Sequence, residues 1–423
     1  MRPVRALTAK SVGALCCGLA LAVAGCDQRA PDSRPVAAAP SPPQQSVSPS
    51  MGATSAPAKE AFTHAKHVRL SEGAGYQVLE MQAALGDNAG TARTQRRFIA
   101  VLVPRSAPLP TLPDTLRDAV VVRTPVERFA VTTGADERML TELGLAQRLV
   151  AVGGTKSYDD RIRERVLRKE LAQVGYSWHS PPNLDVLVAS KPDVFLLRLW
   201  SLELATSLER ANKLGVPTLP ILMDAEPTAL ARAEWIKVFG ALAGELPAAE
   251  ARFAEIEAAY RQWQQRAATQ APKAALWAYY DGAQRWVATV RGPEAGLLRD
   301  AGARLVLGEA DAPGAEDVRK VGTEALLAVA DQPDCWIAGD IHARQLPDER
   351  TLAAFKAYRQ GCFFGNFGRS KPQWDAFDWY ETGVVRPDLV LRDLVKMLHP
   401  TLVAEPFEFL QPITRDAAGG KPR

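Results

Sequence analysis

Short apolar runs that alternate with amphipathic stretches constrain this chain more than any other feature. The runs begin after Val126 and are mostly continuous, as expected for parallel strands buried on both faces. The stretches between them, such as Asp136–Leu143 and Leu202–Leu214, have helical character, and Gly144 and Gly215 follow them as typical C-terminal caps. The pattern predicts a βαβ series and an α/β fold. The strand-like runs in this half are Arg128–Thr132, Leu149–Val152, Val194–Leu197 and Thr218–Leu222.

The second half of the chain repeats the first. Between the halves, the stretch from Thr228 to about Gln270 predicts one long helix with a kink or break near Gly244–Pro247. We therefore predict two similar Rossmann-like α/β lobes joined by a single long rigid helix. The matches come in the same order: Leu143–Gly153 with Ala301–Gly308, then Asp185–Ala189 with Glu324–Ala328, each of the latter pair followed by Pro-Asp and a strand.

The N-terminus carries an export signal. Three basic residues, Arg2, Arg5 and Lys10, precede the uncharged apolar stretch Val12–Ala24, which is too short to span a bilayer stably. The segment Asp27–Glu60 contains seven prolines and no Leu, Ile or aromatic residue, so it cannot bury enough apolar surface to fold. We expect a cleaved signal peptide followed by a disordered tether.

A lipid anchor is predicted at the junction of these two segments. Val23–Cys26 resembles the lipobox of bacterial lipoproteins, which implies that the Cys26 thiol takes a diacylglycerol. Asp27 resembles an inner-membrane retention signal, so we expect a periplasm-facing protein held at the inner membrane by lipid alone. The alternative is an ordinary signal peptide with an incidental Cys.

Charge and cysteine content narrow the class of protein. The formal net charge of +3 is supplied entirely by the three basic residues of the export signal, so the mature protein is near neutral and nucleic acid is not an expected partner. Of five cysteines, only Cys335 and Cys362 remain in the mature body, where they are disulfide candidates or two free thiols. The five histidines are dispersed, so we predict no metal site and no cofactor.

The predicted organisation divides the chain into seven parts. Residues 61–120, with strand-like runs at Tyr76–Ala83 and Arg97–Val103, form an accessory hairpin region. The full order is signal peptide 1–25, lipidated Cys and tether 26–60, accessory region 61–120, N-lobe 121–230, linking helix 231–270, C-lobe with a C-terminal helix 271–405, and tail 406–423.

Three segments resemble the periplasmic substrate-binding proteins of ABC importers for iron-siderophore complexes and cobalamin. Asn183–Leu197 is similar to the first-lobe signature of that family, Arg232–Gly240 to the start of its linking helix, and Trp379–Pro400 to its C-terminal helix. The resemblance covers residues 120 to 405 and implies a ligand cleft between two lobes joined by a helix. It also implies that an acidic residue on each lobe, here Asp185 and Glu324, docks onto the permease.

Candidate ligand-binding residues follow from sheet geometry, because ligands of open α/β sheets meet the loops at the carboxyl ends of the strands. Arginines there suit an anionic ferric chelate, and aromatic rings suit its organic shell or a corrin ring. Structural ion pairs and core packing are the competing explanations. The candidates are Thr132, Thr133, Tyr158, Arg198, Trp200, Tyr280, Arg291, Arg369 and Trp374.

Enzyme motifs such as G-x-S-x-G, H-E-x-x-H, the Rossmann glycine fingerprint and the P-loop are absent from the sequence. Together with this absence, the resemblance implies a monomeric binding protein, not an enzyme, that captures a ferric siderophore and delivers it to an ABC permease dimer with its ATPase. Cobalamin and haem are the alternative ligands. An exported lipoprotein enzyme and a ligand sensor are the alternative functions, because a fold alone does not fix function.

Overall fold

The computed structural model describes residues 61–87, 93–281, 285–307, 317–339, 346 and 348–413. The predicted signal peptide, Cys26 and the tether lie outside these residues, as do residues 414–423 of the tail. Within the described ranges, no helix combines the length and the apolar character needed to cross a bilayer.

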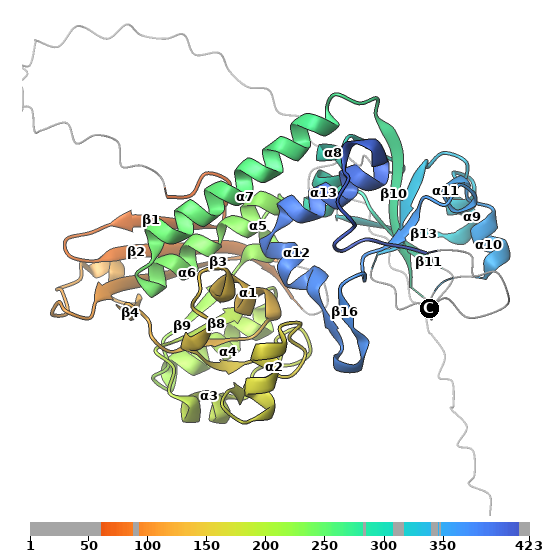
Figure 1. Ribbon diagram of the computed structural model, residues 1–423. Helices are drawn as coiled ribbons and strands as arrows, with labels where there is room; N and C mark the ends of the chain where they lie inside the picture. Colours follow the sequence, from red (N-terminus) through yellow and green to blue (C-terminus); the bar gives the residue numbers. More distant parts are fainter. Residues whose placement is uncertain are drawn as a thin grey trace, which may run out of the picture. The chain divides into compact units, whose positions relative to one another are not determined.

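An accessory sheet precedes the two lobes (Figure 1). The sequence predicts only a hairpin here, and the structure extends that hairpin and adds a strand on each side. The added strands are short, and they are held by pairing with the long central strands. The sheet order is β1-β2-β3-β4, with β3 and β4 parallel and the other pairs antiparallel. The bounds are β1 Val68–Glu72, β2 Gln77–Gly86, β3 Arg93–Pro104 and β4 Val120–Thr124.

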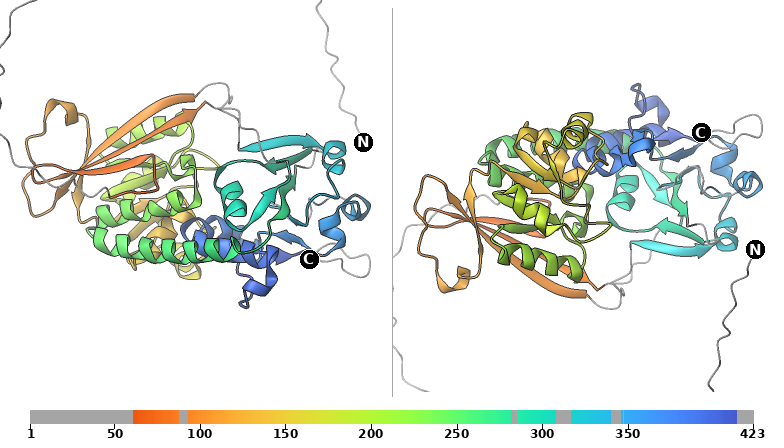
Figure 2. Two further views of the ribbon diagram at one scale, coloured as in Figure 1. Left: turned by 90° about the horizontal axis from the view of Figure 1, so that it is seen from above. Right: turned by 90° about the horizontal axis from the view of Figure 1, so that it is seen from below.

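The N-lobe is a purely parallel sheet with the order β7-β6-β5-β8-β9. Its central strands are buried throughout, which explains their continuous apolar sequences. The accessory sheet flanks it, as both views of Figure 2 show, and Arg96 of β3 pairs with Glu209 of α4 at 2.6 Å. The elements are β5 Phe129–Val131, α1 Gly134–Glu142, β6 Leu149–Val152, α2 Asp160–Leu167, β7 Ala172–Gln173, α3 Leu184–Ser190, β8 Val194–Arg198, α4 Leu202–Lys213 and β9 Thr218–Ile221.

Three helices, rather than one, join the lobes: α5 Ala229–Glu234, α6 Ile236–Ala243 and α7 Leu246–Ala267. The break between α6 and α7 falls where the sequence predicts it. Gly244 adopts φ +74°, a left-handed conformation that ends α6, and Pro247 lies in the first turn of α7, where its missing N–H costs nothing. The long helix of the prediction therefore corresponds to α7 preceded by two short helices.

The C-lobe sheet is mixed, with the order β13-β11-β10-β14-β15-β18 and with β12 paired to β10. Strands β12, β10, β14 and β15 are parallel, whereas β11, β13 and β18 add antiparallel pairs. The elements are β10 Lys273–Tyr280, β11 Arg285–Thr289, α8 Gly292–Asp300, β12 Ala303–Leu305, β13 Val318–Gly322, α9 Thr323–Leu327, β14 Cys335–Ile337, α10 Glu349–Ala353, α11 Lys356–Arg359, β15 Phe363–Gly365, β16 Ser370–Lys371, β17 Ala376–Phe377, α12 Thr382–Val385, α13 Pro387–Leu398 and β18 Gln411–Pro412.

The predicted repeat is confirmed by the topology. Strands β6-β5-β8-β9 of the N-lobe correspond to β12-β10-β14-β15 of the C-lobe, and α3 and α9 precede equivalent strands. The repeated Pro-Asp has one structural role in both lobes. The Asp193 Oδ2 accepts hydrogen bonds from the N–H groups of Glu127 and Arg128, and the Asp334 Oδ2 accepts one from Ala274. Each aspartate thus fastens its strand to the start of the neighbouring parallel strand.

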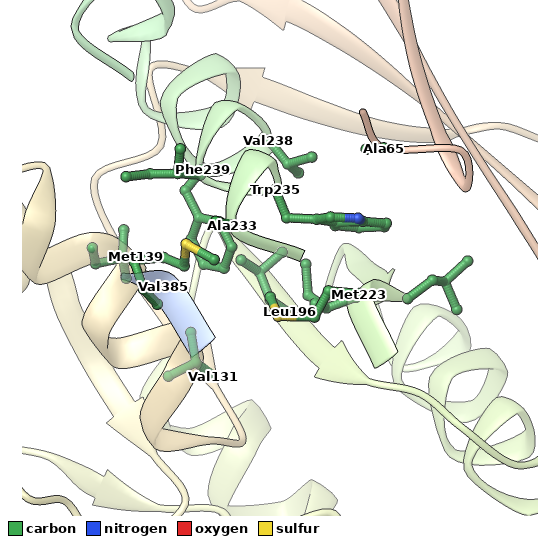
Figure 3. Close-up of a cluster of buried hydrophobic side chains, with 14 of the residues drawn as sticks. Ala65, Val131, Met139, Leu196, Met223, Ala233, Trp235, Val238, Phe239 and Val385 are labelled. Carbon is green, nitrogen blue, oxygen red and sulfur yellow. The ribbon is translucent and has the colours of Figure 1, made fainter. Parts of the chain in front are cut away.

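The joining helices contribute to the core on several sides at once (Figure 3). Trp235, which lies between α5 and α6, is fully buried, and its neighbours include Ala65 of the accessory region and Leu196 of β8. A separate aromatic cluster fills the C-lobe, where the ring of Trp336 lies 4.6 to 5.1 Å from those of Phe355, Phe363 and Trp286. These two clusters of buried side chains hold in place the sheets whose loops carry the candidate site.

The first described residues are fastened to the joining helices by two buried glutamates. The carboxylate of Glu234 accepts hydrogen bonds from the N–H groups of Thr63, His64 and Ala65 at 2.7 to 2.9 Å and from Lys237 Nζ at 2.7 Å. Glu226 accepts the next two N–H groups along the chain, together with the indole N–H of Trp235. Consecutive main-chain donors are thus satisfied without secondary structure.

Candidate functional site

The candidate site is formed by the loops at the carboxyl ends of the N-lobe strands, which we call the N-lobe rim. Thr132 and Thr133 follow β5, and both are buried. Thr133 caps α1 by accepting a hydrogen bond from the Asp136 N–H, and Thr132 Oγ1 accepts one from the Arg198 N–H. These two predicted residues therefore belong to a polar layer beneath the surface of the rim.

Arg198 ends β8 in the same buried layer. Its guanidinium donates two hydrogen bonds to Asp224, at 2.6 and 2.8 Å, and one to Asp136 at 3.3 Å. Burial raises the pKa of Asp136 to about 6 despite the arginine, whereas for Asp224 the Arg198 charge outweighs burial and lowers the pKa. The structure thus holds Arg198 between two carboxylates, the fully buried Asp136 and Asp224, whose side chain is 40% exposed.

Aromatic side chains form the exposed layer of the N-lobe rim. Trp178 is 45% exposed and stacks on Tyr176, with ring centroids 4.5 Å apart, and Trp200 is 38% exposed. His179 accompanies them, with Nε2 2.9 Å from Lys156 Nζ. The sequence prediction includes Trp200 but misses Trp178, because the strand before it, β7, has only two residues, and it does not count His179 among the ligand-binding residues. The sequence signal that could have revealed this part of the rim is the group of two aromatic residues and a histidine between Gly175 and Pro181.

A second group of predicted residues meets where residues 369–381 of the C-terminal part cross to the loop between β6 and α2. The guanidinium of Arg369 lies 5.1 Å from the ring centroid of Tyr158, and Arg163 lies 5.0 Å from that of Trp374. Lys371 donates to the Tyr158 carbonyl at 2.8 Å. The structure therefore brings Tyr158, Arg369 and Trp374 together from distant parts of the sequence.

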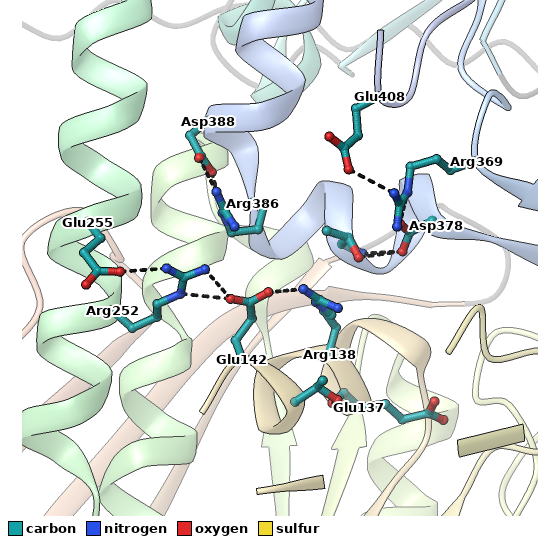
Figure 4. A network of polar contacts seen from close by, with 12 residues as sticks. Glu137, Arg138, Glu142, Arg252, Glu255, Arg369, Asp378, Arg386, Asp388 and Glu408 are labelled. Carbon is teal, nitrogen blue, oxygen red and sulfur yellow. Dashed lines mark hydrogen bonds and ion pairs between the residues drawn. The ribbon is translucent and has the colours of Figure 1, made fainter. Parts of the chain in front are cut away.

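Arg369 is also held by two carboxylates, Asp378 at 2.5 Å and Glu408 at 2.9 Å (Figure 4). The lysines beside it are paired as well, Lys156 with Asp375 at 2.5 Å and Lys371 with Asp160 at 2.7 Å. Because Asp375 and Asp160 are more than half exposed, these two lysine pairs are weakly held. An anionic ligand can compete for these lysines more easily than for Arg198.

The remaining predicted residues belong to the C-lobe. Tyr280 ends β10 and lies 5.2 Å from the Trp286 ring, and Arg291 precedes the first residue of α8, as Thr133 precedes α1 in the N-lobe. Cys335 and Cys362 form a disulfide that joins the first residue of β14 to the residue before β15. In the described part of the chain, no group of three His, Cys, Asp or Glu residues is arranged to hold a metal ion.

A family model for periplasmic binding proteins matches residues 130–365, which include most of both lobes. The chain belongs to this family. The match confirms the resemblance found in the sequence, and the two similar α/β lobes confirm the predicted fold class. None of the curated proteins matches the chain.

Solved structures similar to this fold belong to binding proteins of the same kind. A periplasmic heme binding protein from Pseudomonas aeruginosa is 19% identical, with a TM-score of 0.51, over 68% of this chain and 98% of that chain. An ABC transporter solute binding protein from Sulfurospirillum deleyianum is 17% identical, with a TM-score of 0.51, over 69% and 88% of the two chains. A possible iron-binding periplasmic solute-binding protein from Staphylococcus epidermidis is 13% identical, with a TM-score of 0.50, over 65% and 100%. At these identities the likeness shows the fold alone.

Proposed function

We propose that this chain is the lipid-anchored substrate-binding component of an ABC importer and that it captures a ferric siderophore for delivery to the permease. The observation that carries the proposal is the N-lobe rim of a periplasmic binding protein with two solvent-exposed tryptophans, Trp178 and Trp200. Exposed indoles at the ends of parallel strands offer flat apolar area to the organic shell of a metal chelate.

The charges near the rim favour an anionic chelate. Lys371 lies 4.4 Å from the ring centroid of Tyr158, and Lys156 precedes Tyr158 in the same loop; each lysine is paired with a well-exposed aspartate. A ligand oxygen that replaces such an aspartate gains a charge-assisted hydrogen bond and loses little, because exposed ion pairs are worth only about 0–1 kcal/mol. We propose that these lysines, with Arg369, take the cationic role that the sequence assigned to Arg198, Arg291 and Arg369.

Haem is the second candidate, because His179 lies next to the Tyr176–Trp178 stack. A neutral imidazole can ligate haem iron while the flat macrocycle packs on the indole. The similar structure from Pseudomonas aeruginosa is that of a periplasmic heme binding protein, which makes this ligand worth testing first among the alternatives. Cobalamin would use the same aromatic area without an anionic group.

A fluorescence screen of the full chain against ferric siderophores, haem and cobalamin tests the proposal. Saturable tryptophan quenching by a ferric siderophore, weakened by Lys156→Ala with Lys371→Ala, is the expected result. Haem binding that is lost in His179→Ala would replace the siderophore by haem. No binding of any of these ligands would reject this substrate class and favour an exported enzyme on the same fold.

We further propose that Asp185 and Glu324 dock the two lobes onto the two permease subunits. They occupy equivalent positions, on α3 and α9, and both are exposed. Three residues after each acid, on the same helix face, stands an exposed aliphatic side chain: Val188 is 40% exposed and Leu327 is 38% exposed. An acid beside an apolar side chain, repeated once per lobe, suits a symmetric partner with a basic residue beside an apolar patch.

Uptake measurements separate docking from ligand binding. The variants Asp185→Ala with Glu324→Ala, and Val188→Ser with Leu327→Ser, should bind ligand normally and support reduced uptake in cells. Normal uptake by both folded double variants would reject the docking role, and normal ligand binding without any transport by the wild type would favour a sensor. Retention of palmitate labelling in Cys26→Ser would reject the proposed anchor.

A further inference from the structure

Two buried glutamates from distant parts of the sequence lie at the first turn of α1, where the C-terminal part of the chain meets the N-lobe. Glu137 lies in α1, and Glu381 immediately precedes α12. Only 1% of Glu137 and 7% of Glu381 is exposed. The Glu381 side chain packs on Gly134, the first residue of α1, where a Cβ atom would fall 2.5 Å from the carboxyl carbon of Glu381. The absence of a side chain at Gly134 therefore makes room for this carboxyl group.

The two carboxyl groups have few hydrogen-bond donors. The Glu381 Oε1 accepts one hydrogen bond, from the Tyr158 N–H at 2.7 Å. Neither oxygen of Glu137 has a hydrogen-bond partner in the part of the chain that the structure describes, and Figure 4 shows Glu137 pointing away from the network of Arg138 and Glu142. A buried carboxylate without donors or a countercharge is expensive, whereas the neutral acid is not.

The surrounding charges do not offset the cost of burying these two carboxylates. The groups that face the pair are acids or neutral donors: Asp136 on α1, Ser157 and Asp159 in the loop before α2, Tyr176 after β7, and Asp378 before α12. Each nearby cation forms its ion pair with another carboxylate. The pairs are Arg198 with Asp136 and Asp224, Arg163 and Lys371 with Asp160, Lys156 with Asp375, Arg369 with Asp378, Arg386 of α13 with Asp388, and Arg232 of α5 with Glu294. In the described ranges, neither Glu137 nor Glu381 forms an ion pair with any of them.

The same conditions shift the titration of both groups upwards. Burial raises the pKa of Glu137 to about 8 although the nearby Ser157 hydroxyl lowers it, and the charges of Asp136 and Asp159 act in the same direction as burial. Burial and the charge of Glu137 raise the pKa of Glu381 well above its ordinary value. Ionising both would place two like charges side by side in a low dielectric.

We propose that Glu137 and Glu381 form a proton-binding site that holds the C-terminal part of the chain on the N-lobe. While a proton is bound, repulsion between the two carboxyl groups is absent and Glu381 stays packed between Gly134 and the Tyr158 N–H. Loss of the proton at alkaline pH loosens residues 369–381 from the loop that carries Tyr158. The inference rests on this contact alone and is independent of any ligand.

The pH dependence of unfolding tests the site in the full chain. Both acids have raised pKa values when folded, so their contribution to stability is complete below about pH 4.5. The contribution of Glu137 is lost as the pH rises through about 8, and that of Glu381 as the pH rises through its own raised pKa. For one proton, the unfolding equilibrium constant should rise about tenfold per pH unit in this window, relative to a variant that lacks the site. Glu137→Gln and Glu381→Gln should each reduce this dependence, and the double variant should abolish it.

Glu142→Gln is the matched control. Glu142 lies on the same helix and is buried, but Arg138 and Arg252 pair with it and outweigh burial, so its pKa is lowered. Its replacement should destabilise the protein and leave the slope between about pH 4.5 and 8 unchanged. An unchanged slope in Glu137→Gln and Glu381→Gln would overturn the proposal.

Infrared spectroscopy of the wild type keeps the proposal testable if the variants do not fold. A protonated carboxyl band should be present at pH 7 and disappear as the pH is raised above 8. Absence of that band at pH 7 would overturn the proposal. Strong stabilisation at pH 8 by sodium or an alkylammonium ion would also overturn it, because the two carboxylates would then form a cation site.

Discussion

The two lobes share an order of strands but differ in where their tryptophans lie and in how the lobes are fastened. Trp178 and Trp200 of the N-lobe rim are exposed, whereas Trp286 and Trp336 lie within strands of the C-lobe sheet and are fully buried. Next to the N-lobe, the buried carboxylates of Glu234 and Glu226 hold the first described residues, whereas the C-lobe is cross-linked by a disulfide. The repeated Pro-Asp shows that residues which build the sheets have been kept in both halves. The position of the tryptophans and the kind of fastening, by contrast, differ between the halves.

The largest expected effect concerns the carboxylate fastening. Glu234→Ala removes the acceptor for three consecutive N–H groups and leaves Lys237 buried without its partner. We expect a loss of about 3–5 kcal/mol in the free energy of unfolding, because removing one member of a buried ion pair strands the other. Chemical denaturation measures it.

Glu209→Ala, which breaks only the exposed pair with Arg96, is the control and should cost less than about 1 kcal/mol.

The pH dependence of the Glu234 contribution should be opposite in sign to that of Glu137. Burial raises the pKa of Glu234, but Lys237 and the main-chain donors outweigh it, so the folded pKa is lowered. Its contribution is complete above about pH 4.5 and is lost as the pH falls through the folded pKa. Equal losses of stability in Glu234→Ala and Glu209→Ala would contradict the claim that the buried carboxylate holds the first described residues more strongly than an exposed ion pair does.

The disulfide should give the next largest effect. Replacing Cys335 and Cys362 by Ser opens a loop of 27 residues and should lower the free energy of unfolding by about 3 kcal/mol. Alkylation without reductant, followed by mass spectrometry, checks the bond in the wild type. Two alkylated thiols in the folded protein would show that the C-lobe lacks this fastening.

The repeated aspartates should give smaller and unequal effects. Asp193→Ala deprives two N–H groups and Arg105 of their acceptor, whereas Asp334→Ala deprives one N–H group and Lys356. We expect a loss of about 1–3 kcal/mol for Asp193→Ala and a smaller one for Asp334→Ala, in proportion to the donors left without a partner. Thermal unfolding of the two variants side by side gives the order. A reversed order would mean that the two positions are not equivalent.

The sequence predicts the framework well because its signals are local. Continuous apolar runs locate β5, β6, β8 and β9, glycines mark the ends of helices, and repeated Pro-Asp marks equivalent strands. The joining helices also follow from Gly244 and Pro247. Each of these signals depends on neighbours within a few residues, which a sequence displays directly.

The candidate site is predicted less well because its chemistry depends on residues far apart in the chain. Arg198 can be placed at a strand end, but its pairing with Asp136 and Asp224 cannot be read from spacing. Trp178 follows a two-residue strand that periodicity does not detect. Glu137 and Glu381 are separated by more than half of the chain, so only the folded structure shows that they share one buried space.

Calorimetric titration of a ferric siderophore into the full chain tests most directly whether the exposed N-lobe rim is the ligand-binding surface. The account predicts saturable binding by the wild type and a loss of about 1.4 kcal/mol, or tenfold in Kd, in Trp178→Ala, because the stacked indole is removed. Trp263→Ala on α7 is the matched control and should bind as the wild type does. Undiminished affinity in Trp178→Ala and Trp200→Ala, or binding lost equally in Trp263→Ala, would contradict the account.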